Sequence, residues 1–68
     1  MSAYKIIEVV GTSPKSWAEA GREAVSSASK SIRNLRVAEV VKMDATIDAK
    51  GKIKEFRVRM AIGFKYEA

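Results

Sequence analysis

The chain contains no cysteine, no histidine and a single proline among its 68 residues. Without cysteine, no disulfide can brace the fold and no thiolate can act as a nucleophile. Without histidine, the commonest proton shuttle of enzymes is missing, and a zinc site would lack its two usual ligand types. These absences favour a binding protein over an enzyme.

Long apolar runs are also missing. No stretch approaches the roughly 20 apolar residues that span a bilayer, and residues 1–4 are too few and too polar to begin a signal peptide. We therefore expect a cytoplasmic protein that has no membrane partner. The length predicts one domain, residues 1–68. A lone domain of this size buries only about 60% of its unfolded surface, so we expect it to fold as part of an assembly.

The charge is unbalanced, with 13 basic and 8 acidic residues and a net charge of +5. A basic domain can bind nucleic acid, an anionic surface or a phosphate-bearing small molecule. Here the basic residues are dispersed among the acids, and no aromatic platform lies between them. This pattern favours solvated faces and ion pairs between subunits over a nucleic-acid surface.

Apolar residues in residues 3–10 fall on both sides of the expected strand, which predicts a strand that is covered on both faces. The turn formers of residues 11–14 are expected to end it. Ser16 and Glu19 have the spacing of a capping box, and an apolar stripe of small side chains then predicts a helix from Trp17 to about residue 34. Gly21 in this stripe suggests a close approach of the helix to a sheet.

Two long strands follow the helix. The first is predicted over about residues 36–48, and residues 48–51 are typical of a hairpin connection. The second has apolar residues at every second position, which predicts one apolar face turned towards the helix: Phe56, Val58, Met60, Ile62, Phe64 and Tyr66. The order strand, helix, strand, strand predicts an α+β fold with the two long strands paired antiparallel.

Carboxylates are the remaining candidates for chemistry. Five of them lie on or beside expected strands, where two together could act as acid and base or bind a hard cation: Glu8, Glu39, Asp44, Asp48 and Glu55. We favour cross-strand pairing with basic neighbours instead, the candidates being Lys5, Lys42, Arg57 and Arg59. Trp17 is expected to be a partly buried anchor at the helix start rather than a ligand-stacking group.

Four segments together resemble the dodecins. They are residues 4–14 (YKIIEVVGTSP), 16–17 (SW), 33–40 (RNLRVAEV) and 63–67 (GFKYE), in the family's order and with similar spacing. The resemblance implies a three-stranded antiparallel sheet wrapped partly around one helix. It also implies that the chain's partners are copies of itself, assembled into a hollow homododecamer. The assembly would cover the second face of the sheet.

The resemblance also implies a cofactor site. Flavin-binding dodecins stack pairs of flavins (FMN, riboflavin or FAD) on a tryptophan whose position is held here by Val37. A glutamine that contacts the ring edge corresponds to Arg57, and an arginine near the flavin phosphate corresponds to Asp44. Lys5 and Lys65 complete the candidate cofactor-binding residues. A lost aromatic contact costs about 0.5 to 1.5 kcal/mol beyond area burial. A flavin gripped on both sides would lose more than one such contact, and valine leaves an unfilled slot. With a few kcal/mol lost in this way, we expect flavin affinity to be lower by two orders of magnitude or more.

Because it lacks this tryptophan, the chain resembles a subgroup of dodecins that is associated with calcium. Asp44 and Glu8 are the candidate oxygen ligands for such an ion. The ion site would have to be completed by symmetry between subunits. The expected function is therefore a non-enzymatic, homododecameric binding and storage protein for a small, flavin-like ligand with a degenerate pocket. The alternatives are a calcium-binding dodecin without flavin, a purely structural shell, and a small basic nucleic-acid binder.

Overall fold

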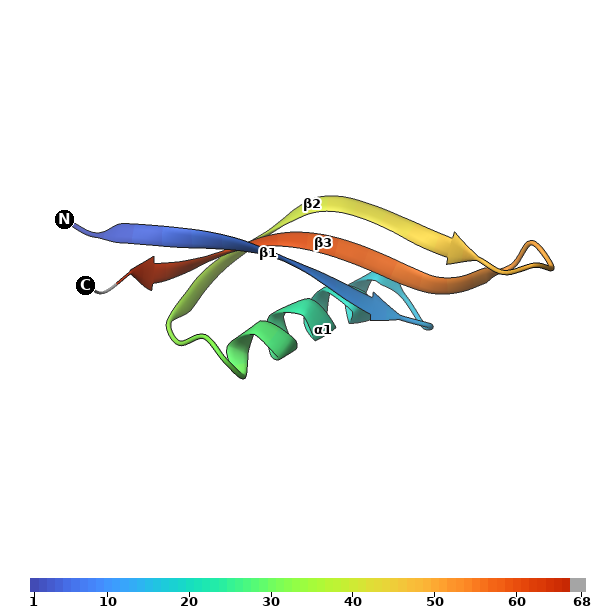
Figure 1. Ribbon diagram of the computed structural model, residues 1–68, viewed down its shortest axis with the longest axis horizontal. Coiled ribbons are helices and arrows are strands. Elements are labelled where there is room, and N and C mark those ends of the chain that lie inside the picture. The colour runs from blue at the N-terminus through green and yellow to red at the C-terminus, as the bar shows by residue number, and fades with distance from the viewer. Residues whose placement is uncertain (67–68) are drawn as a thin grey trace.

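The structure, a computed structural model, describes residues 1–66. Strand β1 (Ala3–Ser13) is followed by helix α1 (Trp17–Ser29) and by strands β2 (Leu35–Ile47) and β3 (Ile53–Tyr66). The sheet has the order β1-β3-β2, and both pairings are antiparallel. Figure 1 shows α1 lying along one face of the curved sheet. The predicted fold class, β-α-β-β with a three-stranded antiparallel sheet and one helix, is confirmed.

The side of the sheet that faces α1, the inner face, carries the core. Buried alanines recur at every fourth position of α1, so they line one side of the helix: Ala20, Ala24 and Ala28. They pack on the predicted apolar face of β3, where Val58, Met60 and Ile62 are buried. Tyr66, which was predicted to share this face, is instead 45% exposed, because the helix does not reach that end of the strand.

The helix approaches the sheet most closely at Gly11. A Cβ atom at this position would lie 2.0 Å from the carbonyl oxygen of Ala20 and 2.6 Å from the amide nitrogen of Ala24. Gly11 is also part of β1. The strand continues to Ser13, whereas the sequence predicted that it would end at residue 10, before a turn. The prediction for Gly21 was wrong too, since a Cβ there would meet Met60 Sδ at an ordinary 3.8 Å.

The helix begins where the sequence predicts and ends earlier. The Ser16 hydroxyl accepts a hydrogen bond from the Glu19 amide at 3.0 Å and caps the first turn, while the Glu19 carboxylate pairs with Arg22 at 2.7 Å. The last helical residue is Ser29, not residue 34. Serines compete with the helical backbone for hydrogen bonds, and the Ser29 hydroxyl donates to the carbonyl of Ser26 at 2.8 Å. Asn34, at φ 64°, then redirects the chain into β2.

Strands β2 and β3 extend beyond the helix as a hairpin. The molecule measures 52 × 19 × 15 Å, and its radius of gyration of 13.9 Å exceeds the about 11 Å of a compact chain of this length. In Figure 1 the hairpin tip lies at one end of the molecule, and the start of β1 and the end of β3 lie at the other. This elongated shape leaves much of the sheet uncovered.

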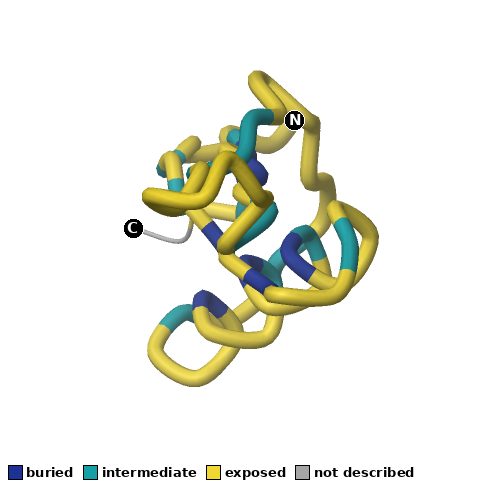
Figure 2. Tube along the Cα trace, turned by 90° about the vertical axis from the view of Figure 1, so that its right-hand side faces the viewer, coloured by how far each residue is buried: buried dark blue, intermediate teal, exposed yellow. Residues whose placement is uncertain are grey.

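The opposite side of the sheet, the outer face, is open. Ile6 is 70% exposed and Val10 is 45% exposed, so within the single chain β1 is covered on one face only. The predicted cover of its second face would have to come from the assembly. Figure 2 shows how few segments of the trace are buried. Within residues 1–66, no helix is long and apolar enough to cross a membrane.

Candidate functional site

An ion pair between β2 and β3 occupies the centre of the candidate site. Asp44 lies opposite Arg57 in the register of the two strands, and both side chains extend from the outer face. Arg57 Nε donates to Asp44 Oδ1 at 2.7 Å, and Arg57 Nη2 donates to Asp44 Oδ2 at 2.8 Å. Such a two-bond pairing is the strong geometry of an arginine with a carboxylate.

The pairing changes the acidity of both groups. The hydrogen bonds from Arg57 lower the pKa of the Asp44 carboxyl below its ordinary value of 3.8, and the positive charges of Arg57, Lys42 and Arg59 act in the same direction. Asp44 in turn raises the pKa of the Arg57 guanidinium. Each partner is therefore held in its charged form, and each satisfies the other before any ligand arrives.

Trp17 fixes the backbone behind this pair. Its indole Nε1 donates to the carbonyl oxygen of Asp44 at 2.9 Å, and its ring packs edge-on against Phe56 with 4.8 Å between centroids. The indole is 37% exposed. Trp17 thus anchors the helix start to the sheet, as predicted, and has a partner in β2 that the sequence pattern did not reveal.

The space around the ion pair is small. A cavity of about 30 Å³ lies between the side chains of Val10, Lys42, Asp44, Arg57 and Arg59. This volume corresponds to about one water molecule or a small ion.

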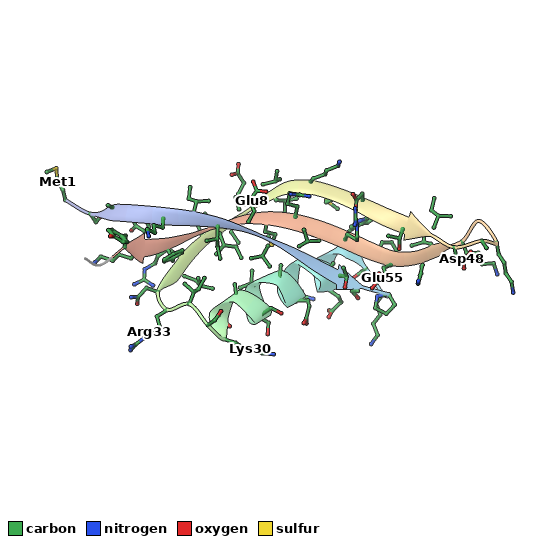
Figure 3. All side chains as sticks on the ribbon, viewed as in Figure 1. Met1, Glu8, Lys30, Arg33, Asp48 and Glu55 are labelled. Atoms are coloured by element: carbon green, nitrogen blue, oxygen red, sulfur yellow. The ribbon has the colours of Figure 1, made fainter. Side chains whose placement is uncertain are left out.

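A second row of charged residues crosses the outer face further along β3. Ala61 pairs with Glu8 on one side and with Glu39 on the other, so two carboxylates flank a small residue with their Cα atoms about 10 Å apart. Glu8 accepts a hydrogen bond from Arg59 at 3.3 Å, one of the predicted cross-strand pairs. Figure 3 shows where Glu8 lies on the sheet. Within residues 1–66, no three acidic side chains gather as a metal site.

Val37 lies on the same face but far from the ion pair. It pairs with Gly63, six residues along β3 from Arg57, a separation of about 20 Å. Its side chain is 66% exposed. Within one chain, Val37 and Arg57 therefore cannot contact the same flavin ring.

Lys5 and Lys65 lie at the opposite end of the molecule from the hairpin tip. They line an open groove of about 440 Å³ together with Arg33 from the loop between α1 and β2 (Figure 3). The Lys5 ammonium sits 4.7 Å from the centre of the Tyr66 ring, a cation–π distance. We call this groove the basic groove. Arg33 was not among the predicted site residues, because the sequence pattern assigned it to the helix.

The five predicted cofactor-binding residues thus divide into three locations in one chain. Asp44 and Arg57 are in direct contact, Val37 lies apart on the outer face, and Lys5 and Lys65 line the basic groove. A site that uses all of them would have to combine residues from different copies of the chain.

The fold thus defines a small α+β protein with one bare sheet face that carries paired charges. The family model described as Dodecin matches residues 3–67, and the chain belongs to the dodecin family. It is 45% identical over 65 residues to the protein named calcium dodecin of Mycobacterium tuberculosis, covering 96% of this chain and 90% of that one. It is 38% identical over 64 residues to the dodecin of Thermus thermophilus, covering 94% and 91%.

Solved structures agree with this assignment. Dodecin from Streptomyces coelicolor superposes with a TM-score of 0.93 at 36% identity, covering 98% of this chain and 94% of that one. The crystal structure of the M. tuberculosis calcium dodecin, described as having a novel calcium-binding site, superposes with a TM-score of 0.86 at 42% identity, covering 97% and 93%. The predicted family membership is confirmed.

Proposed function

We propose that this chain is the subunit of a non-enzymatic, cytoplasmic homododecamer that binds and stores a small ligand, and that this ligand is calcium rather than a flavin. The observation that supports an assembly is the large accessible surface of the single chain. It exposes 5131 Å², whereas a compact monomer of 7.5 kDa exposes about 4,200 Å². The excess of roughly 900 Å² is close to the area that one partner contributes to a standard interface, about 800 Å².

Two features support calcium over flavin. The relative with 45% identity is named calcium dodecin. In addition, the ring-stacking position holds Val37, and Arg57 is already bound by Asp44 through two hydrogen bonds. A flavin would find neither an aromatic platform nor a free polar partner at these positions.

Glu8 and Glu39 are the side chains that we propose for the ion. They lie on the open outer face on either side of Ala61, and carboxylate oxygens are the ligands that calcium prefers. Calcium takes six to eight oxygens, more than two carboxylates supply. Carboxylates from a neighbouring copy would complete the site. Asp44, the other predicted ligand, has both oxygens occupied by Arg57.

The test measures mass and binding together. Light scattering should give twelve times the mass of one chain, and calorimetric titration with calcium after chelator treatment should give saturable heat. Glu8→Gln with Glu39→Gln should weaken calcium binding at least tenfold. The matched control, Glu19→Gln with Glu23→Gln, removes the same charge from the helix and should leave the affinity unchanged. A monomer, or a titration without heat, would contradict the proposal.

The basic groove supports a second candidate ligand. The basic groove brings together three cations, Lys5, Arg33 and Lys65, beside the Tyr66 ring. Its volume lies within the about 300–1,000 Å³ of small-molecule sites, and its charge suits a flat anionic molecule such as FMN. Quenching of FMN fluorescence by the purified protein would favour this candidate, and a purified protein without flavin absorbance that also fails to quench would rule it out.

A further inference from the structure

An irregularity in β2 brings an additional cation to the outer face. Val40 pairs with Met60, which is buried on the inner face. The next pair is Lys42 with Arg59, so Val41 is an extra residue that has no partner of its own in β3. Successive side chains of a regular strand alternate between its two faces, and without the extra residue Lys42 would follow Val40 to the inner face. The bulge therefore turns Lys42 to the outer face.

The bulge sets two like charges directly opposite each other. Lys42 faces Arg59 across the two strands, and like charges in this position destabilise an antiparallel pair. Arg57 lies two residues along β3 on the same face, about 7 Å from Arg59. Three cations from two strands are thus gathered in a small area, where their mutual repulsion has to be offset by negative charge.

The neighbouring carboxylates offset this positive charge only in part. Asp44 is bound to Arg57 through both of its oxygens. Glu8 accepts one hydrogen bond from Arg59, at the longer distance of 3.3 Å. Within residues 1–66, Lys42 pairs with no carboxylate. The three cations and two carboxylates therefore leave one positive charge over.

All three cations border the cavity of about 30 Å³ that lies beside the ion pair. An arginine carries five N–H donors and a lysine three. Arg57 uses two of its donors and Arg59 uses one in bonds to carboxylates, so most of the donors around the cavity are unfilled. The one carboxylate that borders it has both oxygens bound to Arg57. Such a lining suits an anion, because a cation would compete with Arg57 for the same two oxygens.

The acidity of Asp44 reports the sign of the electrostatic potential at the cavity. Hydrogen bonds from Arg57 are the main reason that the pKa of the Asp44 carboxyl is lowered, and the charges of Lys42 and Arg59 lower it further without a hydrogen bond to it. A positive potential therefore acts on any group beside the ion pair. Val10 adds an apolar side to the cavity, which favours an anion that gives up its water readily over a strongly hydrated one.

We propose that this cavity binds one small monovalent inorganic anion, with chloride as its probe, between Lys42, Arg57 and Arg59. The single positive charge left over matches one negative charge, and the volume matches a small ion. The anion site goes beyond the proposed function, because it holds whichever ligand the assembly stores. It is connected to the proposed calcium ligands only through the bond between Arg59 and Glu8.

The width of the chlorine NMR line tests the site, because a chloride ion relaxes faster when it is bound to a protein. Chelator-treated protein without calcium, in which Glu8 stays with Arg59, should broaden the line in a saturable way. Lys42→Gln removes one charged donor and should weaken chloride binding at least tenfold, whereas Lys42→Arg should retain it. The matched control, Lys30→Gln, removes the same charge at the end of α1 and should leave the line width unchanged.

Each other outcome overturns the inference in its own way. A line that the native protein does not broaden would mean that the cavity holds water only. Equal losses in Lys42→Gln and Lys30→Gln would mean a general attraction of chloride to a basic protein. Nitrate should displace chloride at constant ionic strength, and more effective displacement by inorganic phosphate would overturn the assignment to a monovalent ion. All of these results leave the calcium titration untouched, so the two proposals fail separately.

Discussion

The two faces of the sheet differ in how far they expose the same residue type. Ile62, on the inner face, is 1% exposed, and Ile6, on the outer face, is 70% exposed. Both are isoleucines in neighbouring, paired strands. The chain's own helix covers the inner face of β1 and β3, whereas the outer face alternates bare apolar residues with paired charges. The difference indicates that the inner face of β1 and β3 holds the single chain together, whereas the outer face is left open to contacts with other molecules.

The sharpest test of the inner face is Gly11→Ala. The added methyl group would meet backbone atoms of Ala20 and Ala24 at 2.0 and 2.6 Å, and backbone cannot rotate away as a side chain can. We expect a loss of at least about 4 kcal/mol in the free energy of unfolding, above the usual range for overpacking. Urea denaturation followed by circular dichroism measures it.

The matched control is Gly21→Ala. Its methyl group would meet only Met60 Sδ at 3.8 Å, and alanine is the better helix former by about 1 kcal/mol. This variant should be as stable as the native chain or more stable. Equal destabilisation by both changes would mean that Gly11 does not set the distance between helix and sheet.

A pair of isoleucine truncations compares the two faces directly. Ile62→Ala should lower the free energy of unfolding by about 3 kcal/mol, since it leaves a cavity in the core. Ile6→Ala should change it by less than about 0.5 kcal/mol but raise the protein concentration at which the assembly dissociates in light scattering. If Ile6→Ala also unfolds the subunit and spares the assembly, the division between the faces is wrong.

The outer face can be converted towards flavin binding. Val37→Trp with Arg57→Gln would restore the stacking ring and the polar ring-edge partner that the family resemblance implies. We expect flavin affinity to rise about 100-fold, a change of about 2.7 kcal/mol, measured by quenching of flavin fluorescence. Val41→Trp, an aromatic at another exposed position of β2, serves as the control. An unchanged affinity in the double variant would contradict the placement of the ligand at Val37 and Arg57.

The smallest effect concerns the charge of Asp44. Because its pKa is lowered in the folded protein, the pairing with Arg57 stabilises the fold fully above the ordinary pKa of 3.8, and this contribution is lost as the pH falls through the lowered pKa. In Arg57→Gln, the Asp44 pKa should move back up towards the ordinary value. A carboxyl titration by NMR checks this, with Arg22→Gln as the control that leaves Asp44 unchanged.

Much of the fold could be predicted from residue periodicity. The alternation in β3 and the cap at Ser16 determine local structure, and both appear where the sequence places them. The end of α1 and the role of Gly11 could not be predicted. Both depend on which elements meet in space, and a glycine followed by turn formers has the same local pattern in a turn as in a tightly packed strand.

The candidate site was harder to predict than the fold. The resemblance pointed to Val37, Asp44 and Arg57 as site residues. It did not predict that Asp44 and Arg57 bind each other, because pairing across strands depends on a register that contains irregularities. Three such shifts occur between β2 and β3, and each one changes which residues face each other. Arg33 was missed for a related reason, since the helix ends four residues before it.

Trp17 gives this protein a built-in optical reporter. It is the sole tryptophan of the chain, and its indole joins the start of α1 to the backbone of Asp44. Its emission therefore responds to any event that separates the helix from the hairpin or changes the contacts beside it. Folding, and any contact made at the start of α1, can be followed from this one ring without attaching a dye.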